Sequence, residues 1–148
     1  MYHSKRLIVA VLIIVGLQLL ACQKPHGTNH AEHPAEIVKI EGSDLSRVTL
    51  TEKAMQRLDL KTDQVREVMV KRSTSPRRVV PYSSLIYDVK GQTWIYTSLQ
   101  PRTFVRHKVD VDYIEGDMAV LNDGPPAGTV VASVGVAELY GAEFKVGH

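Results

Sequence analysis

Three of the six histidines in the chain, His26, His30 and His33, lie close together in the sequence. Neutral imidazole is a good ligand for zinc and copper, so these side chains could bind a metal ion between them. The surrounding residues 23–36 contain no Cys or Met, and two prolines interrupt them. An unfolded segment also loses conformational entropy when it closes around an ion. The composition therefore favours a polar, disordered tether, with a weak metal site as the alternative.

The only cysteine, Cys22, follows an apolar leader. Residues 1–6 are basic and residues 7–21 are apolar, an order that is typical of a secretory signal peptide. The apolar run of about 15 residues is shorter than the roughly 20 that cross a bilayer as a helix. The closing sequence LLAC resembles the lipobox of bacterial lipoproteins, in which the thiol is acylated before cleavage. The resemblance implies a signal helix over residues 1–21, lipidation at Cys22, and a membrane-anchored lipoprotein of the cell envelope that faces the periplasm.

Charge and motif content exclude several functions. Without the leader, the chain has 18 − 2 = 16 basic and 16 acidic residues, so electrostatics does not favour nucleic acid or an anionic membrane as the main ligand. Ser133 lacks the first Gly of a nucleophile elbow, and the glycines are scattered singly, unlike a phosphate-binding loop. Acylation would also use the only thiol. We therefore expect a protein that is not an enzyme and has no cofactor.

Short β-rich runs separated by turn residues begin near residue 37. They predict a mostly β domain over residues 37–148, a small antiparallel β-barrel or sandwich with one short helix, preceded by a tether over residues 22–36. Thr51 is a suitable N-cap for that helix. Gly91 favours a hairpin because glycine adopts positive φ at little cost. Strands are expected at residues 36–41, 47–50, 64–71, 79–80, 85–87, 93–99, 104–114, 118–121 and 129–134, turns or loops at 71–78, 115–117 and 122–128, and a short terminal helix at 136–140.

The run 104–114 shows a clear alternation of apolar and charged residues. Val105, His107, Val109, Val111 and Tyr113 share one face, and Arg106, Lys108, Asp110 and Asp112 share the other. The first face is expected to be buried, with His107 as a structural histidine. The second is expected to be a solvated ladder of ion pairs between the two basic and the two acidic residues. The basic residues of loop 71–78 are also expected to be solvated.

The order of the motifs resembles a known family. Residues 48–58, 80–86, 94–96, 104–109 and 128–131 follow one another as in the membrane-proximal region of periplasmic adaptors. These adaptors are the membrane fusion subunits of resistance-nodulation-division efflux pumps, here most similar to the metal-efflux branch. The resemblance covers about residues 46–143. It implies a β-rich domain beside the inner membrane whose partners are an inner-membrane efflux transporter and full-length adaptor subunits.

A full adaptor leaves this domain to build a β-barrel, a lipoyl-like domain and an α-helical hairpin, and then returns. In this chain the three inserted parts would have to lie between Val70 and Val79, where only residues 71–78 are present. We therefore expect a non-catalytic accessory or truncated adaptor module of an efflux complex, with heavy metals as one possible cargo. The alternative is an extracytoplasmic metal-binding lipoprotein that uses His26, His30 and His33.

Replacing Cys22 by Ser should abolish acylation, because the chain has no other thiol. Metabolic labelling with a fatty-acid analogue measures this directly. Label that persists in the Cys22→Ser protein would refute the lipoprotein assignment.

Overall fold

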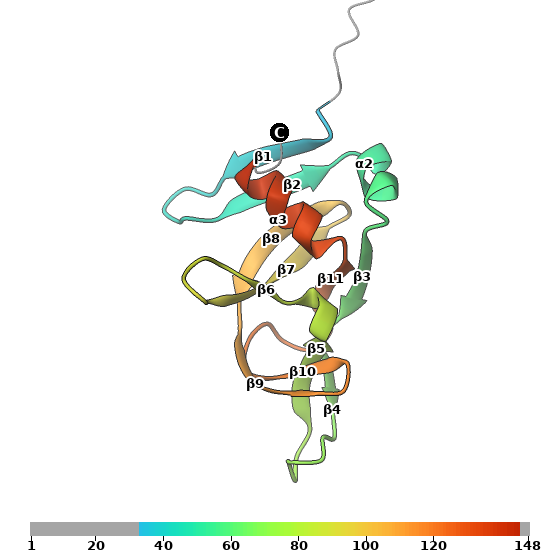
Figure 1. The fold of residues 1–148 in the computed structure, drawn as a ribbon, viewed down its shortest axis with the longest axis vertical. Helices are drawn as coiled ribbons and strands as arrows, with labels where there is room; N and C mark the ends of the chain where they lie inside the picture. Colours follow the sequence, from blue (N-terminus) through green and yellow to red (C-terminus); the bar gives the residue numbers. More distant parts are fainter. Residues whose placement is uncertain (1–32, 146–148) are drawn as a thin grey trace, which may run out of the picture. The chain divides into compact units, whose positions relative to one another are not determined.

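Antiparallel strands form about half of residues 33–145, the part of the chain that the computed structural model describes (Figure 1). The predicted signal helix and most of the predicted tether lie outside these residues. The larger sheet contains β1 (Ala35–Lys39), β2 (Ser46–Leu50), β3 (Lys61–Gln64), β6 (Ile86–Tyr87), β7 (Thr93–Gln100), β8 (Thr103–Lys108) and β11 (Val130–Val134). The smaller sheet contains β4 (Arg66–Val68), β5 (Arg77–Pro81), β9 (Asp110–Glu115) and β10 (Met118–Asp123). The helices are α2 (Glu52–Arg57), the 3-10 turn η2 (Tyr82–Ser84) and α3 (Val136–Phe144).

The strand order explains how the layers form. The larger sheet runs β1-β2-β8-β7-β11-β3, with β6 also paired to β7, and the smaller runs β4-β5-β10-β9. The central strand β7 is buried on both faces, because Tyr96 faces the helices and Ile95 faces the smaller sheet. The prediction of a mostly β, antiparallel, sandwich-like fold is confirmed.

No helix within residues 33–145 has the length and hydropathy to cross a membrane.

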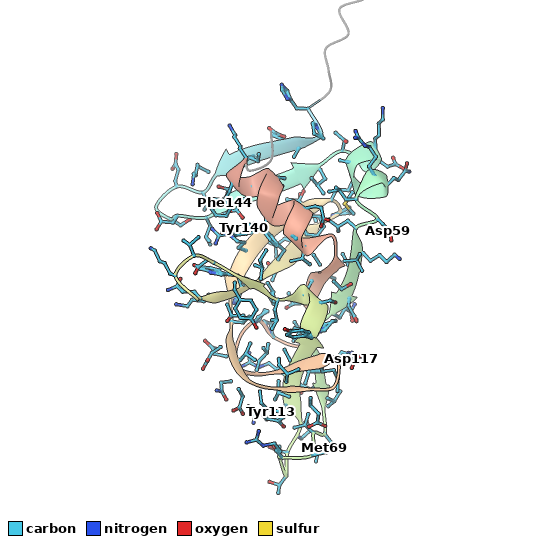
Figure 2. The ribbon with its side chains drawn as sticks, viewed as in Figure 1. Asp59, Met69, Tyr113, Asp117, Tyr140 and Phe144 are labelled. Atoms are coloured by element: carbon cyan, nitrogen blue, oxygen red, sulfur yellow. The ribbon has the colours of Figure 1, made fainter. Side chains whose placement is uncertain are left out.

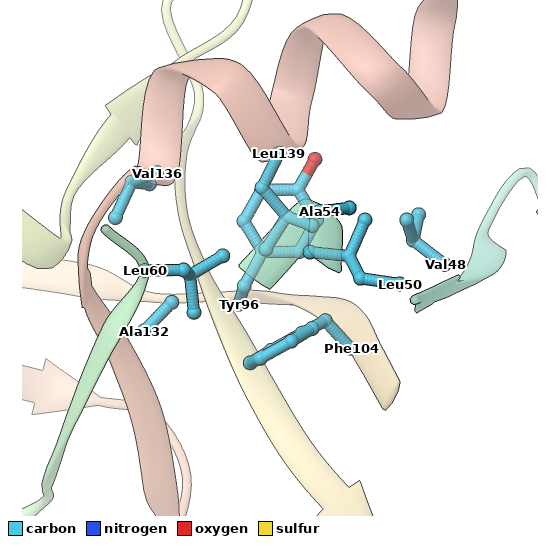
Figure 3. Close-up of a cluster of buried hydrophobic side chains, with 9 residues drawn as sticks. All are labelled: Val48, Leu50, Ala54, Leu60, Tyr96, Phe104, Ala132, Val136 and Leu139. Carbon is cyan, nitrogen blue, oxygen red and sulfur yellow. The ribbon is translucent and has the colours of Figure 1, made fainter. Parts of the chain in front are cut away.

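Two apolar cores lie on opposite faces of the larger sheet. The first lies between this sheet and the two α-helices (Figure 3), and its buried members are Val48, Leu50, Ala54, Leu60, Tyr96, Phe104, Ala132, Val136 and Leu139. The second joins the two sheets and contains Val65, Val80, Ile95, Val109, Ala119, Leu121 and Val131. Burial of these side chains is the main favourable contribution to folding.

Local signals in the sequence account for the turns and caps. Thr51 caps α2, and its Oγ1 accepts a hydrogen bond from the Ala54 N–H at 3.1 Å. The predicted hairpin around Gly91, which has φ +73°, joins β6 to β7. Strand β5 ends at Pro81, as predicted. The terminal helix is also present, but it extends to Phe144 rather than to residue 140.

Two strand predictions are wrong because the chain changes sheets within them. The run 64–71 divides at Val65 into β3 and β4, and the run 104–114 divides at Val109 into β8 and β9. At both breaks the backbone remains hydrogen-bonded. The Val65 N–H donates to the Thr129 carbonyl at 2.9 Å, and the Val109 N–H donates to the Thr93 carbonyl at 3.0 Å. The chain therefore passes from one sheet to the other without leaving these polar groups unpaired.

The predicted burial of β8 is also wrong. Helix α3 covers the face that carries Phe104 and Arg106, so both are buried, whereas His107 on the other face is exposed. His107 is therefore not a buried structural histidine. In β9 the prediction is closer, since Val111 and Tyr113 are half-buried and Asp110 and Asp112 are exposed.

A buried ion pair fastens α3 to the sheet. Arg106 Nε donates to Glu143 Oε2 at 2.8 Å, and the Tyr96 hydroxyl donates to the same oxygen at 2.6 Å. The side chains of Arg106 and Glu143 are only 6% and 1% exposed. Burial, together with the hydrogen bond to the Glu143 carboxylate, raises the pKa of Tyr96. The two donors therefore reach Glu143 from adjacent strands and hold the last turn of α3.

Arg106→Ala should destabilise the domain by about 3–5 kcal/mol, because it leaves the Glu143 carboxylate buried without its charged partner. Lys108→Ala, at an exposed position of the same strand, is the matched control and should change stability by no more than about 0.5 kcal/mol. Chemical denaturation followed by circular dichroism measures both. Similar small effects for the two variants would contradict the role assigned to the ion pair.

Candidate docking surface

The residues that sequence patterns single out for chemistry do not form a site within residues 33–145. Cys22, His26 and His30 lie outside the described residues, and His33 is exposed two residues before β1 begins. Among the described residues, no three His, Cys, Asp or Glu side chains lie close enough together to hold a metal ion. Exposed apolar side chains on turns are the candidates for a docking surface in this part of the chain.

The β6–β7 hairpin projects the most exposed apolar side chain in the described part of the chain. Val89 is 98% exposed at the turn, and the neighbouring Tyr87 is 56% exposed. Lys90 next to them is also exposed. A single exposed apolar side chain is common on protein surfaces, but Val89 and Tyr87 lie two residues apart on the same turn, and exposed apolar side chains that group together can mark a protein contact. We refer to residues 87–92 as the hairpin tip.

The Asp88 side chain holds the hairpin tip in one conformation. Its Oδ1 accepts hydrogen bonds from the backbone N–H groups of Lys90 and Gln92 at 2.8 and 2.9 Å. Its Oδ2 accepts a third from the indole Nε1–H of Trp94 at 3.0 Å. The Gly91 N–H also donates to the Asp88 backbone carbonyl at 2.9 Å. Both oxygens of one carboxylate thus fix the backbone that presents Val89.

These contacts change the acidity of Asp88. Desolvation raises the pKa of the carboxyl group, but the hydrogen bonds from Gln92, Trp94 and Lys90 and the charge of Lys90 together outweigh it. The net result is a pKa below the ordinary value of 3.8. The hairpin tip is therefore stabilised by the ionised form of Asp88.

A second projection lies between β4 and β5. Met69 in this segment is 62% exposed (Figure 2), whereas the next residue, Val70, is buried. Val70 packs with Val79 and Val120 in a small third core. The Arg72 guanidinium stacks over the Tyr113 ring, with its Cζ 4.3 Å from the ring centre. The segment is thus folded back onto the smaller sheet, and Met69 is its exposed apolar contact.

Two arginines expected in a solvated loop belong instead to β5. Arg77 donates to Asp112 Oδ2 at 3.0 Å and to the Leu121 carbonyl at 3.2 Å. Arg78 donates to the Gly124 carbonyl and so fastens the loop after β10. Both side chains are less than one-third exposed. The prediction of solvated side chains is wrong for these two residues.

The ion-pair ladder predicted along residues 106–112 is not formed. Asp112 pairs with Arg77 of β5, and Arg106 pairs with Glu143 of α3. Arg106 lies in β8 and Asp112 in β9, so the two residues belong to different sheets and bind partners from different elements.

Part of this surface could have been recognised in the sequence. An Asp whose side chain accepts from backbone N–H groups further along the chain is a common turn device, and Asp88 lies at the start of a predicted turn. No pattern identifies Trp94 as its third donor.

No protein-family model matches this chain, and no curated protein matches it.

Acidification should loosen the hairpin tip. Because the folded-state pKa of Asp88 is lowered, its stabilising effect is present above the unfolded-state value of about 3.9 and is lost as pH falls through the folded-state value. Trp94 is the only tryptophan, so its fluorescence reports on this bond. We expect an emission change with a midpoint below 3.8 while the far-UV circular dichroism stays constant.

Asp88→Asn is the control, because it keeps an oxygen acceptor but does not titrate in this range. The emission change should be absent from this variant. A midpoint above 3.8, or the same transition in the Asn variant, would contradict the assignment.

Proposed function

We propose that this chain is a lipid-anchored, non-catalytic accessory module of an efflux complex in the cell envelope. Its β domain would dock on an inner-membrane efflux transporter or on full-length adaptor subunits. Acyl chains on Cys22 would keep it at the membrane, because two or more chains anchor stably where one does not.

The order of the motifs within one folded unit carries this proposal. The segments that resemble the membrane-proximal region of adaptors fall on successive elements of the compact unit that begins at His33. Residues 48–58 cover most of β2 and α2, and residues 80–86 run from β5 through η2 to β6. Residues 94–96 and 104–109 lie in or next to the adjacent strands β7 and β8. A single unit that contains all five segments is compatible with an adaptor-like module.

The connection between β4 and β5 supports a module without the distal adaptor domains. A full adaptor would leave the membrane-proximal domain at this point. Here the two strands pair directly, with Arg66 opposite Val79 and Val68 opposite Arg77. Val70 from the connecting segment is buried against this sheet. The connection between β4 and β5 therefore holds none of the distal adaptor domains that would reach an outer-membrane channel.

The hairpin tip is the surface through which we expect docking. Its apolar side chain is already extended and its backbone is fixed by Asp88, so little conformational entropy is lost on binding. Full burial of one valine side chain contributes roughly 1.5–3 kcal/mol. Further contacts from Tyr87 and from the charge of Lys90 would add area and specificity.

A photo-crosslinking amino acid at position 89 should capture an inner-membrane efflux transporter or a full-length adaptor in intact cells, as identified by mass spectrometry. The same group at position 53, an exposed residue on α2, is the matched control and should capture them much less. The module should also fail to restore efflux to cells that lack the full-length adaptor. Capture of only unrelated envelope proteins, or full rescue of efflux, would contradict the proposal.

A further inference from the structure

We infer that Arg106 couples the conformation of the hairpin tip to that of the last turn of α3. The two elements are far apart in the sequence, but an unbroken series of contacts joins them: Asp88 to Trp94, Trp94 to Arg106, and Arg106 to Glu143 and Phe144. The inference concerns the domain itself and does not depend on the identity of its partner.

The first link fixes the orientation of the Trp94 ring. Its indole N–H donates to Asp88 Oδ2 at 3.0 Å. Trp94 is half-buried and lies opposite Ile86, one residue pair beyond the pair that closes the turn. If the turn opens, this hydrogen bond is lost and the ring is free to reorient.

The second link is a cation held between two aromatic rings. The Arg106 Cζ lies 4.6 Å from the centre of the Trp94 ring and 4.8 Å from that of Phe144. Attraction between a guanidinium and an aromatic face depends on their relative orientation and is strengthened by desolvation. Arg106 is 6% exposed, so a shift of the Trp94 ring cannot be compensated by contact with water.

The third link is sensitive because Glu143 has few partners. Its Oε2 accepts from Arg106 and Tyr96, while its buried Oε1 has no hydrogen-bond partner among the described residues. Tyr96 is a neutral donor to the same oxygen, so Arg106 is the charged partner of Glu143, and a change in the position of Arg106 leaves the buried carboxylate without its counter-charge. Since Glu143 and Phe144 end α3, the last helical turn responds.

Both ends of this series carry exposed apolar side chains. Val89 is 98% exposed at the hairpin tip, and Phe144 is 45% exposed at the end of α3, where its ring also packs 4.6 Å from that of Tyr140 (Figure 2). A partner that holds the hairpin tip would thereby order the turn that presents Phe144. Coupling of this kind is reciprocal, so contact at Phe144 would also stabilise the hairpin tip.

Amide hydrogen exchange of the purified full chain in detergent tests the coupling. Asp88→Ala should accelerate exchange in residues 141–144 at least about fivefold. The amide of Leu58, the C-cap residue of α2, donates to the Ala54 carbonyl and should keep its rate. Trp94→Phe keeps an aromatic ring beside Arg106 but lacks the N–H, so it should produce the same acceleration. The double variant should be no faster than either single variant, because both changes break the same link.

Val89→Ser is the matched control, since it alters the tip without touching the Asp88–Trp94 bond, and it should leave residues 141–144 unchanged. Three outcomes would overturn the inference. In the first, Asp88→Ala accelerates only the Lys90 and Gln92 amides. In the second, Leu58 accelerates as much as α3, which indicates general destabilisation. In the third, the two single effects multiply in the double variant, which indicates independent routes.

Discussion

The contact between Arg106 and Glu143 determines how the larger sheet is covered. Removing two charges from water is costly, and a buried ion pair is not by itself a source of net stability. Once the pair has formed, however, the loss of either partner is strongly destabilising, because the remaining charge would stay buried. The pair therefore selects one position for α3, in which Leu139 and Val136 close the core over Tyr96. The cover of the first core depends on this position.

Features that are set by a few neighbouring residues were predictable from the sequence. Thr51 begins α2, Gly91 turns the hairpin and Pro81 ends β5, and each acts through its own backbone or side-chain chemistry. The mostly β character also follows from local propensity and turn spacing. For the same reason the hairpin tip was placed correctly, since its turn is determined within residues 88–92.

Features that depend on distant residues were not predictable. The alternating pattern of residues 105–113 continues unchanged through Val109, although the chain changes sheets there, because period two describes a strand and not the sheet to which it belongs. Arg106 was assigned to solvent because its partner Glu143 lies 37 residues further along the chain. The Asp88–Trp94 bond was not predictable either, although the two residues belong to one hairpin, since only the folded hairpin brings the indole N–H to the carboxylate.

The hairpin tip cannot be stiff through strand pairing alone. Strand β6 has only two residues and pairs with β7 alone, so few backbone hydrogen bonds between strands hold it. Its order must come from Asp88 and from Trp94, and Trp94 lies beneath Arg106. The guanidinium that holds α3 on one side therefore supports the projecting turn on the other. A docking element with a short strand is feasible in this fold because the Asp88 bonds inside the turn are supplemented by Trp94, whose ring packs against the buried Arg106.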